Sequence, residues 1–428
     1  MKRLIVVLAI IFLSQDLFAQ TPGYSRKIID TLTSSTMQGR GYSNNGDKLA
    51  AAFIYNEFTG DHLKFFGTDY YQQFPLSINT FPDKADVTID NQKLNPVYDF
   101  LISGSSPSLK GSFLLITLNK HMIKHKNAMK RFKRNDFSDK FIVIDRSNIK
   151  TSDKKSIAFL DSVRNYNPFK AKGIIAIKDK NLTWGASGAR KISSFTEIDI
   201  LKGKMPSRAK KIQLDVESHF LKDYPTQNVI GYVLGKEQPD TFLVFCAHYD
   251  HLGKMGKDVY FPGANDNASG SAMMLDLAKY YSKPENQPKY SIAFLSFSGE
   301  EAGLLGSQYY TEHPLFPLKS IKLLINLDMV GTGSDGAIIL NGRPNESVFH
   351  CFDQINTSKN YLKTLTIGGV SQSSDHYYFY KNGVPAIFII TKGKDYTEYH
   401  SLYDRPESLP LTAYNNLFKL ITDFVTVF

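Results

Sequence analysis

Three stretches of this sequence decide its fold. Residues 241–253 read TFLVFCAHYDHLG, residues 263–281 read GANDNASGSAMMLDLAKYY, and residues 290–307 read YSIAFLSFSGEEAGLLGS. The first and third begin with apolar runs typical of buried strands, and the second is a glycine-flanked acidic loop that opens a helix. In open α/β sheets, ligands bind beyond the carboxyl ends of the strands. We therefore expect one crevice to collect the polar side chains of all three stretches, which are His248, Asp250, Asp266, Glu300 and Glu301.

Strand-like and helix-like segments alternate through the second half of the chain. Further apolar runs lie at 229–233, 323–327, 338–340 and 386–390, and helical spacing recurs at 271–281, 304–311 and 413–425. This alternation predicts an α/β fold with a mixed, mostly parallel sheet sandwiched by helices. Near the N-terminus we expect two more helices, at 28–32 and 49–58. The core-facing stripe of the second helix would include Leu49, Ala50, Phe53, Ile54 and Phe58.

A stretch with a different sequence pattern interrupts this alternation of strands and helices. Short β-like runs separated by lysine-rich loops fill residues 81–222, and none of them has metal-ligand or nucleophile spacing. A chain of 428 residues exceeds what one hydrophobic core usually supports. We predict a discontinuous main domain at 21–80 and 223–428, interrupted by a smaller β-rich domain at 81–222, which we call the insert.

The chain is basic, with 51 Lys and Arg against 41 Asp and Glu and a net charge of +10. Seven of these cations lie within residues 120–134, where there is no acid. A nucleic-acid patch is one interpretation, but no helix-turn-helix, finger or stacking-aromatic pattern accompanies it. We favour a solvated helix face or loop, and we expect no nucleic-acid partner.

The first twenty residues are typical of a signal peptide. Lys2 and Arg3 precede a short apolar run, and Phe18-Ala19-Gln20 offers a cleavage point. We expect an exported protein, periplasmic or secreted, without a stable membrane anchor after signal removal; a membrane-anchoring helix is the alternative. The two cysteines, Cys246 and Cys351, are interpreted as structural.

Two more metal-ligand candidates follow strand-like runs. Asp328 ends the run at 323–327, and His400 lies beyond the run at 386–390. The full set is then His248, Asp266, Glu301, Asp328 and His400. Zinc takes such mixtures of imidazole and carboxylate, whereas Mg²⁺ and Ca²⁺ use few imidazoles. Five ligands exceed one open zinc site, and they fit two zinc ions about 3.5 Å apart with one carboxylate between them.

Several residues near this set have supporting interpretations. Of the adjacent pair Glu300 and Glu301, one can bind metal while the other takes a proton from an activated water. Asp250 is expected to hold the far N–H of the His248 ring. Arg40 is expected in a structural ion pair. The histidines His251, His313 and His350 are interpreted as structural because none has a partner in the constellation.

Together the motifs resemble a known family. HYDHLG, GANDNASG, SGEEAGLLGS, NLDMVG, SSDHYYFYKNGVPAIF and YHSLYD follow the order of motifs in the di-zinc exopeptidases typified by bacterial leucyl aminopeptidases. The resemblance implies that the main domain is a zinc peptidase domain. It implies that His248 and Asp328 hold one zinc, Glu301 and His400 hold the other, Asp266 bridges them, Glu300 is the general base, and Asp250 lies behind His248. The insert resembles a protease-associated domain at 139–146 and 171–175.

The resemblance also implies an activity. It is zinc-dependent hydrolysis of the N-terminal peptide bond of peptides, through a metal-activated water. A carboxypeptidase, with Arg343 as the clamp for the terminal carboxylate, is an alternative. A glutaminyl-cyclase-like acyltransferase with one zinc is another, and a binding protein on an inactive scaffold is a third. An inactive scaffold should have lost ligands or the base, and none is missing here.

Overall fold

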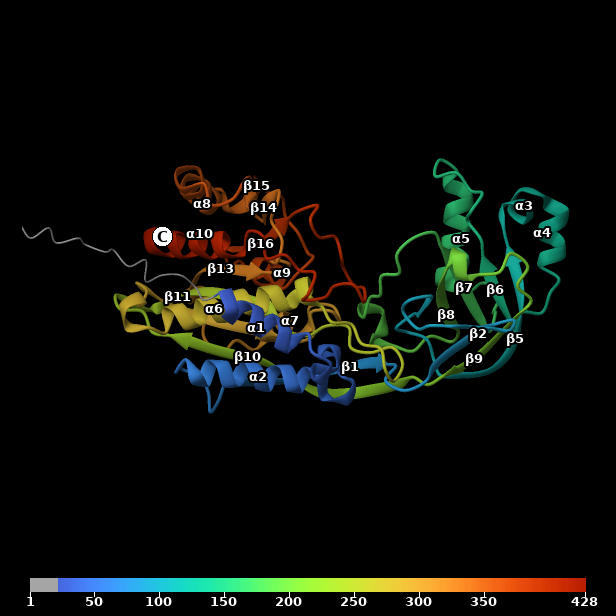
Figure 1. Cartoon of the computed structure of the whole chain (residues 1–428), viewed down its shortest axis with the longest axis horizontal. Helices are drawn as coiled ribbons and strands as arrows, with labels where there is room; N and C mark the ends of the chain where they lie inside the picture. Colours follow the sequence, from blue (N-terminus) through green and yellow to red (C-terminus); the bar gives the residue numbers. More distant parts are fainter. Residues whose placement is uncertain (1–21) are drawn as a thin grey trace, which may run out of the picture.

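A pair of long antiparallel strands connects the two bodies of the molecule (Figure 1). They are β1 (Tyr71–Thr80) and β10 (His219–Val233), and their register pairs Tyr71 with Val229 and Thr80 with His219. The computed structural model describes residues 22–428, so the expected signal peptide at 1–20 lies outside the described residues. Within 22–428, no helix is both long and apolar enough to cross a bilayer.

The main body is built on one eight-stranded sheet. Its strand order is β1-β10-β12-β11-β13-β16-β14-β15. The strands not yet introduced are β11 (Gln238–His248), β12 (Tyr290–Phe297), β13 (Ile321–Leu327), β14 (Gly336–Leu340), β15 (Leu365–Ile367) and β16 (Ala386–Lys392). The four central strands β12, β11, β13 and β16 are parallel, whereas β10 and β14 run antiparallel to their neighbours in this central group. The predicted mixed, mostly parallel α/β sheet is confirmed.

Side chains of the central strands alternate between two helical layers. On β11, Leu243 and Phe245 point into one apolar cluster, and Val244 and Cys246 point into another. The first cluster holds residues of α1 (Pro22–Leu32), α2 (Gly46–Gly60), α6 (Ser269–Tyr281), α8 (Glu346–Lys359) and α10 (Tyr414–Val427). The second holds residues of α7 (Leu305–Glu312) and α9 (His376–Lys381). Because both faces are covered, the central strands are continuous apolar runs in the sequence.

The insert contains a second eight-stranded sheet with the order β3-β2-β9-β5-β6-β7-β8-β4. Its strands are β2 (Ala85–Ile89), β3 (Gln92–Leu94), β4 (Phe100–Ile102), β5 (Leu109–Leu118), β6 (Lys140–Ile144), β7 (Gly173–Lys178), β8 (Thr196–Leu201) and β9 (Lys211–Val216). Its helices are α3 (Lys120–Lys124), α4 (Lys126–Phe132) and α5 (Lys154–Tyr166). The basic stretch forms α3 and α4, whose one buried residue is Phe132, as expected for a solvated helix face.

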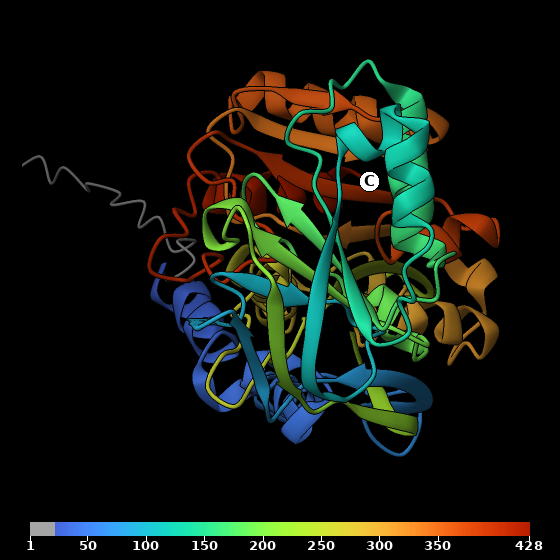
Figure 2. The same cartoon turned by 90° about the vertical axis from the view of Figure 1, so that its right-hand side faces the viewer.

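The insert packs against the main body through a shared apolar cluster. This cluster joins Phe81 and Phe100 on the insert side to Met255, Phe261 and Leu402 on the other. Backbone contacts reinforce it, because the Gly256 N–H donates to the Phe81 carbonyl at 2.8 Å. Figure 2, which looks along the long axis of the molecule, shows the insert in front of the main body. The predicted boundaries at 81 and 222 remain a proposal.

The predicted core-facing stripe of α2 is correct at Ala50, Ile54 and Phe58 and wrong at Leu49. In α2 the buried apolar residues are Ala50, Ala51, Ile54 and Phe58, and Leu49 is 45% exposed. Leu49 lies five residues before Ile54, which places it about 140° around the helix from that core position. The apolar character of Leu49 therefore misled the sequence-based interpretation.

The different burial of Ile54 and Leu49 in α2 predicts different effects of their substitution on stability. We expect Ile54→Ala to lower the free energy of unfolding by about 2–5 kcal/mol, because it opens a cavity in the core. Leu49→Ala should change it by less than about 0.5 kcal/mol. Urea unfolding of the two variants measures both values, and equal losses would contradict the assigned helix face.

Candidate metal centre

The predicted ligands and base converge at the carboxyl ends of the central strands. His248 is the last residue of β11, and Asp328 follows β13 directly. Glu300 and Glu301 lie in the turn after β12, and Asp266 lies in the turn that opens α6. His400 comes from a long loop beyond β16. One pocket is lined by Met329, Leu340, Ser373, Phe388, Ile390 and Tyr399 together with His248, Asp266, Glu300, Asp328 and His400.

His248 is the centre of the first cluster. Its Nε2 atom lies 3.4 Å from Asp266 Oδ1, 3.6 Å from Asp328 Oδ1 and 3.9 Å from Glu300 Oε2. The ring is almost fully buried. Its other nitrogen, Nδ1, lies 3.2 Å from the backbone carbonyl oxygen of Asp250. A carbonyl can only accept a hydrogen bond, so Nδ1 donates, and Nε2 is left facing the carboxylates, where a metal ion could take the place of its proton.

His400 is the centre of the second cluster. Its Nε2 atom lies 3.0 Å from Asp266 Oδ2 and 3.1 Å from Glu301 Oε2. The two carboxylate oxygens of Asp266 therefore face two different imidazoles. This arrangement suits a carboxylate that is shared by two cations.

The donor set fits bound cations. Asp266, Glu301 and Asp328 are buried, and no lysine or arginine within residues 22–428 forms a salt bridge with them. Asp328 Oδ1 is buried without a hydrogen-bond partner. Buried carboxylates are costly unless they are paired or coordinate metals. Imidazole nitrogen with carboxylate oxygen is a ligand mixture that suits zinc.

The pKa values of the site reflect the same concentration of negative charge. Burial alone would lower the pKa of His400, but the carboxylates of Glu301 and Asp266 raise it to about 11. Burial raises the pKa of the Glu300 carboxyl well above its ordinary value, against the attraction of His248. A carboxyl group with a raised pKa beside such a site is suited to proton transfer.

Asp250 supports the site differently from the prediction. Its Oδ1 atom lies 3.7 Å from His248 Nδ1, and that nitrogen is bonded to the Asp250 backbone carbonyl instead. The carboxylate accepts the Tyr42 hydroxyl at 2.8 Å and the Glu300 backbone N–H at 3.1 Å. Asp250 therefore ties the end of β11 to the turn that carries the two glutamates.

The interpretation of His251 as having no partner in the constellation is wrong. Its Nδ1 atom lies 2.7 Å from Glu301 Oε1, so Glu301 contacts both His251 and His400. The Nε2 atom of His251 is buried without a partner. The available signal was the second histidine of the HYDH motif, which follows the same strand end as His248.

Two further supports were missed because they come from distant segments. The Ser374 hydroxyl donates to Asp328 Oδ2 at 2.8 Å. Asp404 accepts the backbone N–H groups of Asn265 at 2.7 Å and Asp266 at 3.0 Å. Each contact spans more than 40 residues, and only the assembled fold brings these segments together.

Arg40 does not form the ion pair that we expected. It is fully buried, and its guanidinium donates to the backbone carbonyls of Tyr249, Leu32, Pro262 and Gly263 at 2.7–2.9 Å. Three of these carbonyls belong to the segments that lead from β11 to Asp266. Arg40 therefore fixes the path of the chain into the centre of the site.

Comparison with known proteins agrees with this geometry. Residues 228–425 match the model of peptidase family M28. The resemblance to zinc exopeptidases is thus confirmed, and the M28 match includes every candidate ligand, from His248 to His400.

Two curated proteins show how far along this chain the sequence similarity extends. Aminopeptidase YwaD of Bacillus subtilis is 28% identical over 267 residues, which cover 59% of this chain and 55% of that protein. A probable zinc metalloprotease of Pyrenophora tritici-repentis is 31% identical over 165 residues, or 38% of this chain and 32% of its own length. The chain therefore spans about half or less of the curated relatives it matches.

Solved M28-like structures share the complete fold. BSAP, a zinc aminopeptidase from Bacillus subtilis, superposes with a TM-score of 0.69 at 21% identity, covering 94% of both chains. A peptidase M28 precursor from Shewanella amazonensis gives a TM-score of 0.68 at 18% identity, covering 95% of this chain and 93% of the other. At these identities the likeness shows the fold, and it extends over the insert.

The carbonyl contacts of Arg40 predict that this residue stabilises the folded protein. Arg40→Lys keeps the charge, but one ammonium cannot reach four carbonyls. An ammonium has three N–H donors, so at least one of the four carbonyls is left unsatisfied, and we expect a loss of about 1–3 kcal/mol in the free energy of unfolding. The control Arg343→Lys, at an exposed arginine, should change it by less than about 0.5 kcal/mol. Chemical denaturation measures both, and an Arg40→Lys protein as stable as wild type would contradict the role of Arg40.

Proposed function

We propose that this chain is a zinc-dependent aminopeptidase that binds two zinc ions and hydrolyses the N-terminal peptide bond of peptides. The observation that carries the proposal is the position of Asp266, whose two oxygens face His248 and His400, with Glu300 beside the first cluster. An inactive binding scaffold would not need this complete set of ligand-type residues around a proton acceptor.

The ligands divide into two groups in this proposal. His248 and Asp328 would hold one zinc, Glu301 and His400 would hold the other, and Asp266 would serve both groups. When bound, the zinc ions supply Lewis acidity that polarises the scissile carbonyl and lowers the pKa of a water molecule. His251 is a positioning residue, because it donates to Glu301 and so orients that carboxylate.

Glu300 is the general base of the proposed reaction. It lines the pocket, and its carboxyl lies beside His248 without belonging to either group of ligands. Its raised pKa favours acceptance of a proton from the attacking water. The same carboxyl then returns the proton to the amine that leaves.

The charges around the pocket favour the amino end of a peptide. The residues that line it include no lysine or arginine, whereas Asp266, Glu300 and Asp328 all reach it. The candidate carboxylate clamp Arg343 is exposed and does not line the pocket. A carboxypeptidase needs a cation facing the terminal carboxylate, so this observation supports an aminopeptidase.

The rest of the pocket lining is mostly apolar. Met329, Leu340, Phe388 and Ile390 line it, together with Ser373 and Tyr399. Such a lining suits an apolar side chain on the first residue of the substrate. The expected signal peptide would place the enzyme in the periplasm or outside the cell, where peptides are its partners.

Glu300 and Glu301 have separate roles, so their variants should differ. Glu300→Gln keeps the shape of the side chain but removes the proton acceptor, and turnover should fall by roughly 10²–10⁴ with zinc content unchanged. Glu301→Gln should instead lower the affinity for zinc. Kinetic assays and metal analysis on both variants test this. If the two variants behaved the other way round, the assigned roles would be wrong.

The choice of peptide terminus is tested with two matched substrates. One is a short peptide with a free N-terminus and an amidated C-terminus, and its twin is acetylated and has a free C-terminus. We expect zinc-dependent release of residues from the first peptide alone, because the pocket can attract an amine. Release from the acetylated twin alone would make the enzyme a carboxypeptidase.

Cyclisation of an N-terminal glutaminyl peptide without loss of residues would instead favour the acyltransferase. A chelator-treated sample is the control in each assay, since metal-free protein should act on neither peptide.

A further inference from the structure

The two central imidazoles of the proposed zinc centre are oriented in the same way but by different parts of the chain. In each ring Nε2 faces Asp266, and Nδ1 contacts a backbone carbonyl oxygen. For His248 that carbonyl belongs to Asp250, two residues away. For His400 it belongs to Trp184, which lies in the insert, at a distance of 2.6 Å.

The contact between Trp184 and His400 is reciprocal. The Trp184 backbone N–H donates to the His400 carbonyl oxygen at 3.1 Å, while the His400 ring donates to the Trp184 carbonyl. His400 has a positive φ of 49° and lies in a loop outside the regular strands and helices. His248, in contrast, is held by the ladder of β11. The orientation of His400 therefore depends more on this cross-domain pair of hydrogen bonds.

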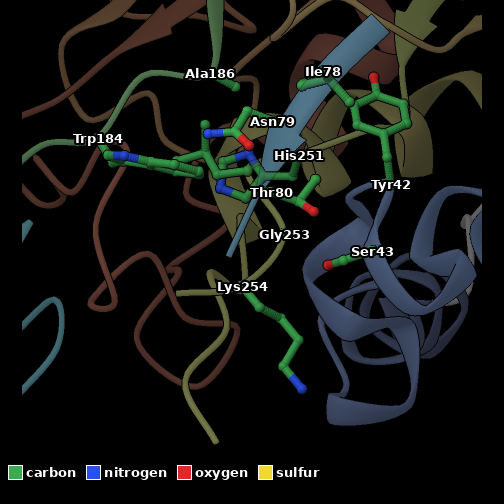
Figure 3. A pocket seen from close by; sticks show the side chains of 11 residues that line it. Tyr42, Ser43, Ile78, Asn79, Thr80, Trp184, Ala186, His251, Gly253 and Lys254 are labelled. Carbon is green, nitrogen blue, oxygen red and sulfur yellow. The ribbon is translucent and has the colours of Figure 1, made fainter. Parts of the chain in front are cut away.

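Trp184 is itself firmly placed. Its side chain is 6% exposed, and its indole N–H donates to the Ile102 carbonyl at the end of β4 at 2.7 Å. The indole stacks on Phe261 of the main body, with ring centroids 5.4 Å apart and planes 12° apart. Figure 3 shows Trp184 and His251 lining one pocket at this junction, together with residues of β1. Anchored to both bodies, Trp184 can hold its carbonyl in place.

We propose that the insert completes the metal centre, with Trp184 as the positioning residue that orients His400 for zinc. This inference rests on the proposed zinc centre. The carbonyl of Trp184 accepts the Nδ1–H of His400, so Nε2 is the nitrogen at which a zinc ion could replace the proton. Partners of this kind typically change metal affinity by about 10- to 100-fold when they are lost. Docking of the insert and zinc binding at His400 are therefore coupled.

Zinc titration of three variants against a competing chelator tests the coupling. Trp184→Ala removes the stack and the indole bond that hold the carbonyl, so one of the two zinc affinities should fall by about 10- to 100-fold. Trp184→Phe keeps an aromatic ring over Phe261 but loses the indole bond, so its loss of zinc affinity should be smaller than that of Trp184→Ala. Leu160→Ala, in a separate apolar cluster of the insert, is the control for general loss of stability and should leave both affinities unchanged.

Wild-type affinities in a folded Trp184→Ala protein would overturn the inference, and so would an equal loss in Leu160→Ala. A second measurement avoids variants, in case Trp184→Ala does not fold. Because coupling is reciprocal, zinc should slow hydrogen exchange of the wild-type protein at the Trp184 amide by about 10- to 100-fold. Exchange in β6 of the insert should not change. Equal exchange at Trp184 with and without zinc would contradict the coupling.

Neither measurement uses a substrate. A protein that shows the expected zinc coupling but cleaves no peptide would therefore contradict the proposed aminopeptidase activity alone. A protein that cleaves peptides but shows no coupling would contradict the role of Trp184 alone.

Discussion

The concentration of negative charge around Asp266 is the constraint on which the rest of the structure depends. The buried carboxylates of Asp266, Glu301 and Asp328 lie 3.0–3.6 Å from the Nε2 atoms of two imidazoles. Glu300 adds a fourth carboxyl, 3.9 Å from His248 Nε2. Such a cluster is stable only if cations balance it. The surrounding fold supplies the rigid frame that keeps these groups apart and correctly oriented while the cations are held between them.

The frame is built in layers around the strand ends. Parallel strands deliver His248 and Asp328 at one edge, because their backbones are fixed by neighbours on both sides. The turns that carry the other ligands are fixed by buried polar groups, with Arg40 on the carbonyls before Asp266 and Asp404 on its backbone N–H. His400, the ligand on the longest loop, takes its hydrogen-bond partner from the insert. His248, at the end of a strand, takes its Nδ1 partner from two residues away, whereas His400, in a loop, takes its partner from the insert.

Much of this could be predicted from the sequence, for physical reasons. Strands buried on both faces are continuous apolar runs, so their ends and the residues that follow them were visible at His248, Asp328 and the glutamate pair. The supports were not visible, because Ser374, Asp404 and Trp184 act across long separations in the chain. Trp184 acts through its backbone carbonyl, which carries no sequence signal. Leu49 and His251 were misjudged because side-chain type alone does not define the direction in which a residue points.

The most direct test of the account is anomalous diffraction at the zinc edge from crystals of the zinc-bound protein. The account predicts two peaks about 3.5 Å apart. His248 and Asp328 should border one peak, Glu301 and His400 the other, and Asp266 should lie between them. A single peak in a zinc-saturated crystal, or two peaks that do not share Asp266, would contradict it.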